Sequence, residues 1–305
     1  LDNFYDRDNP DSAKREKYKE NGTHLQKSGH GSICTTQKGD VYLCHLCGRP
    51  FIPEKCCTLG RETSIQKMMW TDDWLVMEDG SNLAKDKIPE SGLKEVTWSS
   101  EIGKVKFNPW PEYLISPRIE RTNWTTINND GSITIKGQQS LCSLDRVSLI
   151  ARQIRSVYSS FSTSLDFTPV VFQHTAGITM YYDNMNNISL VKTIEEGNEI
   201  IQLVSVENGT KKEYSKTLLT FKGTIDMKCT VNGKSLFFAY KSKNSEKWII
   251  MENLFDTFKL SDEYSNYGEF TGTFCGIFAS DLNKRDSYAT FHYFNYIDEL
   301  PCNVE

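Results

Sequence analysis

The chain has 305 residues and a net charge of −5, so it is long enough for two domains with a substantial core. The acidic balance argues against a nucleic-acid binder, which should present a basic face. No apolar run approaches the roughly 20 residues that span a bilayer, and no signal peptide is visible, so we expect neither nucleic acid nor a membrane as partner. Because the chain begins at Leu1 without Met, a removed or missing N-terminal segment stays open.

The composition favours an all-β fold. Aromatic residues make up 12% of the chain, and Thr, Ser, Ile and Val are frequent, which is typical of strands. Residues 1–27 are polar and loop-like. Four short strands are then expected at Ser32–Gln37, Val41–Cys47, Ser64–Thr71 and Trp74–Glu78. Gly39-Asp40 and Asp72-Asp73 are the expected turns.

A linker is expected from Asp79 to about Lys104, since it holds Gly80, Pro89 and Gly92 and has no periodicity. The remainder reads as one long series of strands. The expected strands are Ser132–Lys136, Arg146–Tyr158, Ser160–Phe167, Ala176–Asp183, Asn187–Ile194, Glu199–Val206, Ile225–Val231, Ser235–Lys241, Trp248–Glu252, Thr273–Ala279 and Ala289–Tyr296. Asn232-Gly233 marks the clearest hairpin. With no helix of three turns or more, this spacing predicts a β-sandwich.

Nine cysteines, an odd number, leave at least one unpaired within the chain. This favours an intracellular protein and leaves secretion open. Cys44-His45-Leu46-Cys47 followed by Cys56-Cys57 could suggest zinc. We reject that reading because residues three apart in a strand point to opposite faces, and cysteine as a small hydrophobe explains the pattern better. No metal site and no cofactor are therefore expected, and calcium binding stays open.

Two side chains stand at glycine-flexed strand ends. His30 lies between Gly29 and Gly31, and Arg61 follows Gly60, where the backbone can take conformations that other residues resist. Imidazole and guanidinium groups in a pocket can polarise hydroxyls or pair with carboxylates. The alternative reading is that both are ordinary surface or capping residues.

Several long, ordered motifs resemble glycoside hydrolase family 43, in its β-xylosidase and α-L-arabinofuranosidase branch. Residues 24–32, 42–50, 59–63 and 65–74 resemble the closing part of that family's catalytic five-bladed β-propeller, and Asp2–Tyr5 resembles the strand end that precedes its last blades. The second half resembles the family's concanavalin-A-like jelly-roll sandwich. The segments that carry this second likeness are Ser148–Gln153, Ala176–Tyr182, Leu260–Glu263, Phe270–Gly276 and Ala289–Phe294.

The resemblance implies a partial propeller over residues 1–92, holding C-terminal blades, and a sandwich over 93–305. It implies an inverting, exo-acting glycosidase, in which one carboxylic acid protonates the leaving oxygen and a second carboxylate activates water. In the family these groups come from earlier blades. No carboxylate of this chain falls on a matching position, so we expect no catalytic residue here. The reactive groups would come from an N-terminal propeller segment or a separate chain, and the chain alone should be inactive.

The resemblance does carry over substrate-binding residues. His30 matches the histidine at the floor of the family's pocket, and Arg61 matches the arginine that contacts the terminal sugar and the catalytic carboxylates. Phe270 would stack on a second sugar, with Phe274 as the next candidate; a core position for Phe270 is the alternative. The implied substrate is a xylo-oligosaccharide or an arabinoside. The sequence does not separate xylose from arabinose specificity, and it leaves a homo-oligomer open.

Two other readings remain. The chain could be a non-catalytic carbohydrate-binding or interface module, because an aromatic-rich sandwich can bind glycans by stacking. It could also be the nonfunctional product of a truncated gene, since lone propeller blades leave open sheet edges that invite aggregation.

Overall fold

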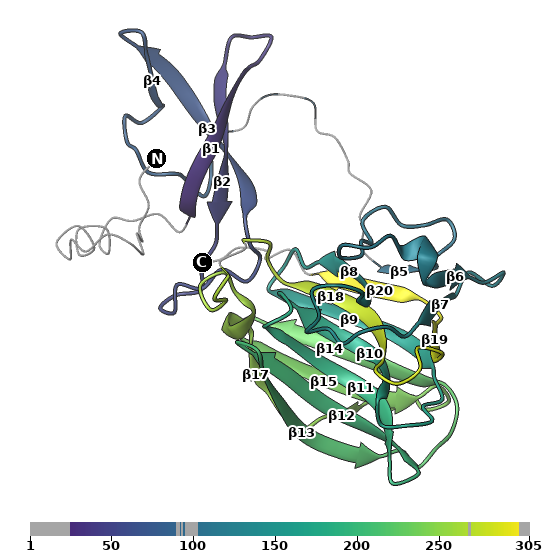
Figure 1. Cartoon of the computed structure of the whole chain (residues 1–305). Helices are drawn as coiled ribbons and strands as arrows, with labels where there is room; N and C mark the ends of the chain where they lie inside the picture. The colour runs from purple at the N-terminus through teal and green to yellow at the C-terminus, as the bar shows by residue number, and fades with distance from the viewer. Residues whose placement is uncertain (1–24, 90–91, 93, 95–102, 268–269, 299–305) are drawn as a thin grey trace. The chain divides into compact units, whose positions relative to one another are not determined.

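The computed structural model describes residues 25–89, 92, 94, 103–267 and 270–298 (Figure 1). The described residues form twenty strands and two short 3₁₀ helices, η1 (Arg121–Asn123) and η2 (Thr257–Leu260), and no α-helix. None of these helices is long and apolar enough to cross a membrane. The chain is therefore all-β, as predicted. Asp2–Tyr5 lies outside the described residues.

The chain divides into two compact units, residues 1–99 and 100–305. From the sequence we predicted the domain boundary between residues 92 and 93. In unit 1, β1 (Gln26–Thr35), β2 (Val41–Gly48), β3 (Glu62–Thr71) and β4 (Trp74–Met77) form one antiparallel sheet in sequence order. A four-stranded antiparallel sheet of consecutive strands is the form of a propeller blade, so unit 1 holds part of a propeller.

The predicted turns of unit 1 have the expected backbone. Asp72 and Asp73 both have positive φ, 49° and 63°, between the paired residues Thr71 and Trp74. Positive φ at both central residues is the requirement of a type I′ hairpin turn, which Asp tolerates. The sheet begins earlier than predicted, because β1 starts at Gln26 instead of Ser32. The glycines at 29 and 31 hid this strand, since glycine is depleted in strands.

Unit 2 is a sandwich of two antiparallel sheets. The six-stranded sheet has the order β13-β12-β11-β10-β18-β8, and the other sheet is built around the path β16-β15-β14-β9-β19-β7-β6. The strands of the first sheet are β8 (Ser148–Gln153), β10 (His174–Tyr181), β11 (Asn187–Glu195), β12 (Asn198–Glu207), β13 (Thr210–Leu218) and β18 (Phe274–Asp281). The strands of the second are β5 (Gly103–Val105), β6 (Thr125–Ile127), β7 (Ile133–Lys136), β9 (Tyr158–Asp166), β14 (Ile225–Asn232), β15 (Ser235–Ser242), β16 (Ile249–Ile250), β17 (Phe255–Asp256), β19 (Tyr288–Phe291) and β20 (Phe294–Asp298).

The central strands of the six-stranded sheet, β10 and β11, are buried on both faces. Met180 of β10 contacts Cys229 of β14, with the two sulfur atoms 3.5 Å apart, so the even-numbered residues of β10 face the second sheet. Ile178 is on that face and is fully buried. The opposite face packs Tyr181 and its neighbours against loop residues; this cluster is Leu141, Val147, Leu149, Ala151, Tyr181, Val191 and Phe278. The loops that pack against the Tyr181 face therefore form the walls of a pocket on that side of the sheet.

The structure differs from the predicted strands of unit 2 at several places, and the short strands β5, β6 and β17 were not predicted. The predicted strand Arg146–Tyr158 is interrupted after Gln153 and resumes as β9 at Tyr158. The predicted strand Ala289–Tyr296 breaks at His292–Tyr293 into β19 and β20. β13 was not predicted, because it is an edge strand with Lys on both faces and hence no alternation of apolar residues.

Candidate functional site

His30 sits on the edge strand of the unit 1 sheet. Gly29 pairs with Leu46 and Ser32 with Cys44, so the register shifts between them, which is a β-bulge. His30 has φ of 47° and its side chain is exposed. A side chain at Gly31 would lie 2.7 Å from Cδ1 of Leu43. Glycine at 31 therefore allows the close approach of Leu43 beside this bulge, in which the imidazole of His30 is exposed.

Arg61 immediately precedes β3 and is half-buried. Gly60 before it has φ of 69°, a conformation that favours glycine. The next residue, Glu62, accepts two parallel hydrogen bonds from Arg49, both 2.8 Å long. Such a bidentate pair is a strong form of ion pair. It gives Glu62 a structural role, because it links the start of β3 to the residue that follows β2.

The structure brings His30 and Arg61 to one sheet with β2 between them. Gly29, Leu46 and Thr63 lie in one row across β1, β2 and β3, and neighbouring strands are about 4.8 Å apart. The acidic pair Asp72-Asp73 lies at the opposite end of β3, in its turn to β4.

Phe270 lies in unit 2, just before β18. Its side chain is 42% exposed, so it is not a core residue. It has φ of 60°, which is unusual for a bulky residue. Its backbone N–H donates to Oη of Tyr182 at 3.1 Å, and that hydroxyl donates to Asp262 at 2.8 Å. Burial, together with the adjacent Asp262 carboxylate, raises the pKa of Tyr182, so this hydroxyl stays protonated and holds the Phe270 backbone.

A small pocket of about 210 Å³ lies next to the Phe270 loop, on the loop-covered face of the six-stranded sheet. Phe274, the other aromatic candidate, lines it and packs against the cluster on that face. The other lining residues are Ile115, Pro117, Arg118, Leu144, Leu149, Ala151, Tyr181, Tyr182, Asp183, Asn184 and Thr271. Ile115 and Leu144 are 52% and 65% exposed, so this wall could take the apolar face of a sugar.

Sequence reasoning missed two groups in unit 2. The first is His174, Asp281 and Asp286, whose donor atoms all lie within 4.8 Å of one another. Asp281 accepts hydrogen bonds from the backbone N–H groups of Asn283, Asp286 and Ser287. Both of its carboxylate oxygens therefore bind the backbone of the loop after β18. The ring of His174 lies 3.5 Å from Asp281. This group therefore has a structural role in fixing the loop between β18 and β19.

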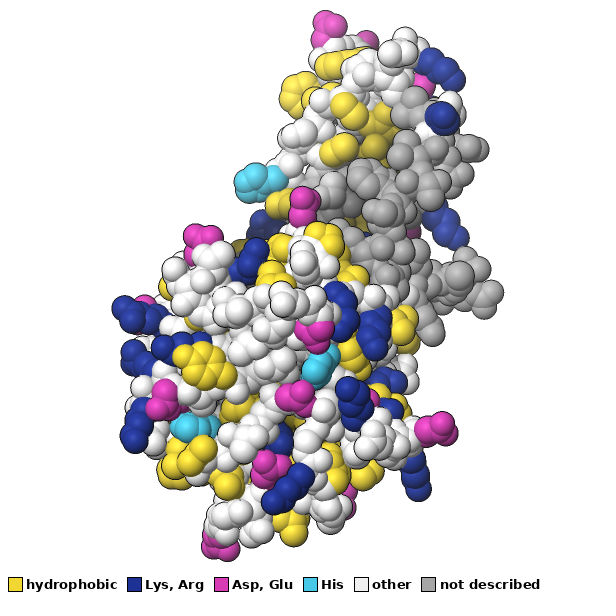
Figure 2. All heavy atoms as spheres, turned by 90° about the vertical axis from the view of Figure 1, so that its right-hand side faces the viewer, with side chains coloured by type: hydrophobic (Ala, Val, Ile, Leu, Met, Phe, Trp, Pro, Cys, Tyr) yellow, Lys and Arg dark blue, Asp and Glu magenta, His cyan; other side chains and the backbone are white. Residues whose placement is uncertain are grey.

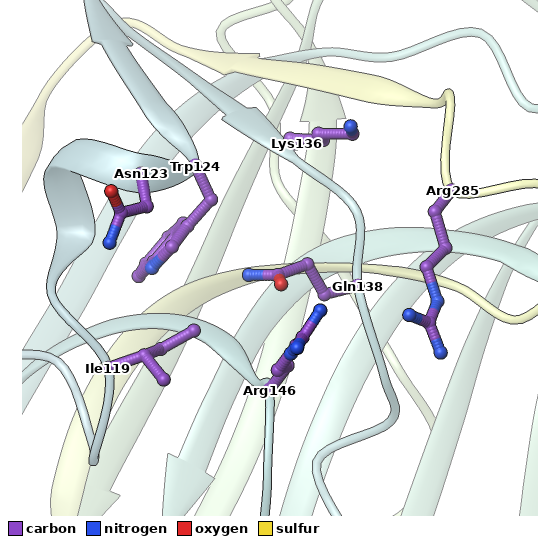
Figure 3. A pocket seen from close by; sticks show the side chains of 7 residues that line it. All are labelled: Ile119, Asn123, Trp124, Lys136, Gln138, Arg146 and Arg285. Atoms are coloured by element: carbon purple, nitrogen blue, oxygen red, sulfur yellow. The ribbon is translucent and has the colours of Figure 1, made fainter.

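The second missed group lines a pocket of about 420 Å³ near the end of β7 (Figure 3). It contains Lys136, Arg146 and Arg285. These cations come from three separate segments, and none belongs to a local motif, so no pattern in the sequence could have joined them.

The fold and these sites define an all-β protein that joins part of a propeller to a jelly-roll sandwich. Residues 7–75 match the model of the glycosyl hydrolases family 43, and residues 110–297 match the β-xylosidase C-terminal concanavalin A-like domain. The chain therefore belongs to glycoside hydrolase family 43.

Its relatives include named enzymes. The chain is 32% identical over 289 residues to xylosidase/arabinosidase 43B of Humicola insolens, covering 89% of this chain and 53% of that protein. It is 28% identical to a β-xylosidase of Bacillus subtilis, covering 94% and 57%. A xylan β-1,4-xylosidase from Bacillus halodurans has the same fold, with a TM-score of 0.86 and 33% identity over 91% of this chain and 54% of that one. The chain thus spans about half the length of the relatives it matches.

Proposed function

We propose that this chain is the C-terminal part of a glycoside hydrolase of the xylosidase or α-L-arabinofuranosidase type, acting on xylan-derived oligosaccharides. The observation that carries the proposal is a family match in both units, over 7–75 and 110–297. We assign the propeller part to 1–92 and the sandwich to 93–305.

In this proposal the chain binds substrate and does not carry out the chemistry. An inverting glycosidase needs a carboxylic acid and a carboxylate on opposite sides of the scissile bond. We infer that both lie on polypeptide outside this chain, because relatives are about twice as long as the matched part. Arg61 would hold sugar hydroxyls and keep nearby carboxylates ionised. His30 would contact the terminal sugar, and the exposed ring of Phe270 would stack on the next one.

The test compares this chain with a fusion that restores the missing part. The chain alone should not hydrolyse aryl β-xylosides or aryl α-L-arabinofuranosides. A fusion to the N-terminal part of the Bacillus halodurans relative should do so, and Arg61→Ala in that fusion should lower kcat/KM by about 100-fold or more. Turnover by the unfused chain that survives Arg61→Ala would refute the proposal. Thermal unfolding of each variant separates loss of binding from loss of fold.

The exposure of Phe270 and the apolar pocket beside it favour a second candidate, a non-catalytic carbohydrate-binding module. The full chain should then bind xylan fragments on a glycan array. Such binding should be lost with Phe270→Ala and unchanged with Arg61→Ala. Loss with both variants favours the glycosidase assignment instead.

A further inference from the structure

The pocket of about 420 Å³ in unit 2 is lined by none of the three residues assigned to the glycosidase site. Its walls come from the end of β7, the segment before β8, the η1 turn and the loop between β18 and β19. The lining residues are Ile119, Asn123, Trp124, Lys136, Gln138, Arg146 and Arg285. Figure 3 shows the Arg146 side chain extending toward Gln138, and Arg285 extending from the loop between β18 and β19. The volume is in the range of pockets that hold small organic molecules.

The pocket is positively charged without an internal counter-charge. Three of its lining residues are Lys or Arg, and none is Asp or Glu. Within the described part of the chain, Lys136 and Arg285 have no carboxylate at ion-pair distance. Arg146 has only Asp145, 3.8 Å away, with both side chains more than half exposed, and such a pair is weak. Three like charges around one cavity repel one another, so an anion in it would relieve that repulsion.

A buried donor points to the same kind of ligand. The side chain of Trp124 is only 4% exposed, and its indole N–H has no hydrogen-bond partner among the described residues. Buried polar groups are almost always paired, so each exception calls for an explanation. An acceptor atom on a ligand would satisfy this N–H. The indole ring and Ile119 also give the pocket an apolar wall, which a bare inorganic ion would not use.

The loop that carries Arg285 is held by the core. Asp281, whose side chain is fully buried, accepts the backbone N–H groups of Asn283, Asp286 and Ser287 at 2.8 to 3.0 Å. A side chain at Gly137 would lie 2.8 Å from Oγ of Ser287 and 2.9 Å from Cβ of Asp281. Glycine at 137 therefore allows the end of β7 to approach this loop closely, and the close approach brings Lys136 and Arg285 to one cavity.

The surface of unit 2 around this pocket carries charges of both signs. On the side of unit 2 that carries β6, β7 and β19, Lys and Arg side chains are interspersed with Asp and Glu (Figure 2). The pocket is thus a local concentration of positive charge.

We propose that this pocket binds a monosaccharide-sized organic anion, a sugar that carries a carboxylate or a phosphate group. The anionic character rests on the pocket alone, whereas the choice of a sugar rests on the proposed function. The cations would bind the acid group, and Trp124 and Ile119 would pack against the ring while the indole N–H donates to a ring substituent. The site would let the protein hold a glycan or product that bears an acidic sugar.

Isothermal titration calorimetry of the full chain tests the proposal with four probes. D-glucuronate and glucose 6-phosphate represent the two acid groups, D-glucose is the matched neutral sugar, and inorganic phosphate is the bare anion. At least one sugar anion should bind, glucose should not, and inorganic phosphate should bind more weakly than the sugar anion. Affinity should fall as salt is raised. Equal binding of glucose and glucuronate, or no binding by either sugar anion, overturns the proposal, and so does a preference for bare phosphate.

Variants assign the binding to this pocket. Lys136→Gln and Arg285→Gln should each weaken the sugar anion by about tenfold or more, because each removes a charge-assisted hydrogen bond. Lys284→Gln makes the same charge change on the same loop at an exposed residue that does not line the pocket, and it should bind like the wild type. An equal loss with Lys284→Gln would mean that only general charge matters, which refutes the assignment. Calorimetry measures binding and not hydrolysis. A failure of this proposal can therefore be distinguished from a failure of the proposed function, which the Arg61 experiment tests.

Discussion

The Asp281 carboxylate should contribute measurably to the stability of the sandwich, and Asp281→Asn tests this. Burial alone would raise the pKa of this group, but backbone N–H groups of Asn283, Ser287, Arg285 and Asp286 outweigh burial and lower it from 3.8 to about 2. The ring of His174 lies 3.5 Å from Oδ1 on the neighbouring strand. The substitution keeps the shape of the side chain, removes its charge and replaces one acceptor with a donor.

The magnitude follows from the pKa. A lowered carboxyl pKa means that folding favours the ionised form, so the stabilisation is complete above the unfolded value near 3.8 and disappears as pH falls through about 2. A shift of this size corresponds to about 2 kcal/mol in the free energy of unfolding at pH 7. The same linkage leaves about half of that difference at pH 3.

Urea denaturation followed by far-ultraviolet circular dichroism provides the assay, with wild type and Asp281→Asn compared at pH 7 and pH 3. Asp256→Asn is the matched control, because Asp256 is exposed and caps η2 without a side-chain hydrogen bond. It should change the unfolding free energy by less than about 0.5 kcal/mol. A pH-independent difference between wild type and Asp281→Asn, or none at pH 7, would refute the reasoning.

Two further substitutions probe the six-stranded sheet, each read by thermal unfolding. Gly177→Ala would place a Cβ 2.0 Å from the backbone oxygen of Leu190, so we expect a loss of about 3 kcal/mol; an unchanged melting temperature would contradict this contact. Lys192→Ala would remove a buried ammonium that donates to the Phe167 carbonyl at 2.7 Å and pairs with Glu199 at 2.9 Å. We expect a loss of about 3 kcal/mol, and a change below about 0.5 kcal/mol would mean that the pair is not held in solution.

Local sequence signals predicted the fold well wherever a turn and an apolar alternation coincide. Gly233 and Lys234 form the turn between β14 and β15, with Asn232 opposite Ser235. The turn is one residue later than the predicted Asn232-Gly233, but Gly233 takes its positive φ of 59°, which glycine favours. The signals failed where tertiary context decides. β13 carries Lys and Glu and is a strand only because β12 supplies its partner, with Ile200 opposite Leu218.

The candidate site divides in the same way. His30 and Arg61 could be predicted as site residues because they lie in contiguous motifs, and the structure adds that His30 lies in a β-bulge and that Arg61 follows a glycine with positive φ. The charged pocket could not be found, since Lys136, Arg146 and Arg285 meet only through strand pairing and the loop after β18. Whether a cation lacks a counter-charge is a property of the folded neighbourhood and not of sequence spacing.

The end of β18 and the loop after it contain one residue that stabilises the fold, Asp281, and another that lines the charged pocket, Arg285. Asp281 is fully buried and organises the loop backbone, whereas Arg285, at positive φ on the same loop, is exposed and lines the pocket. Because Asp281 holds that backbone, Asp281→Asn should weaken the sugar anion as well as the fold, whereas Arg285→Gln should weaken the ligand alone. Parallel loss of both properties with Arg285→Gln would instead assign the arginine a structural role in the loop, and its place in ligand binding would be refuted.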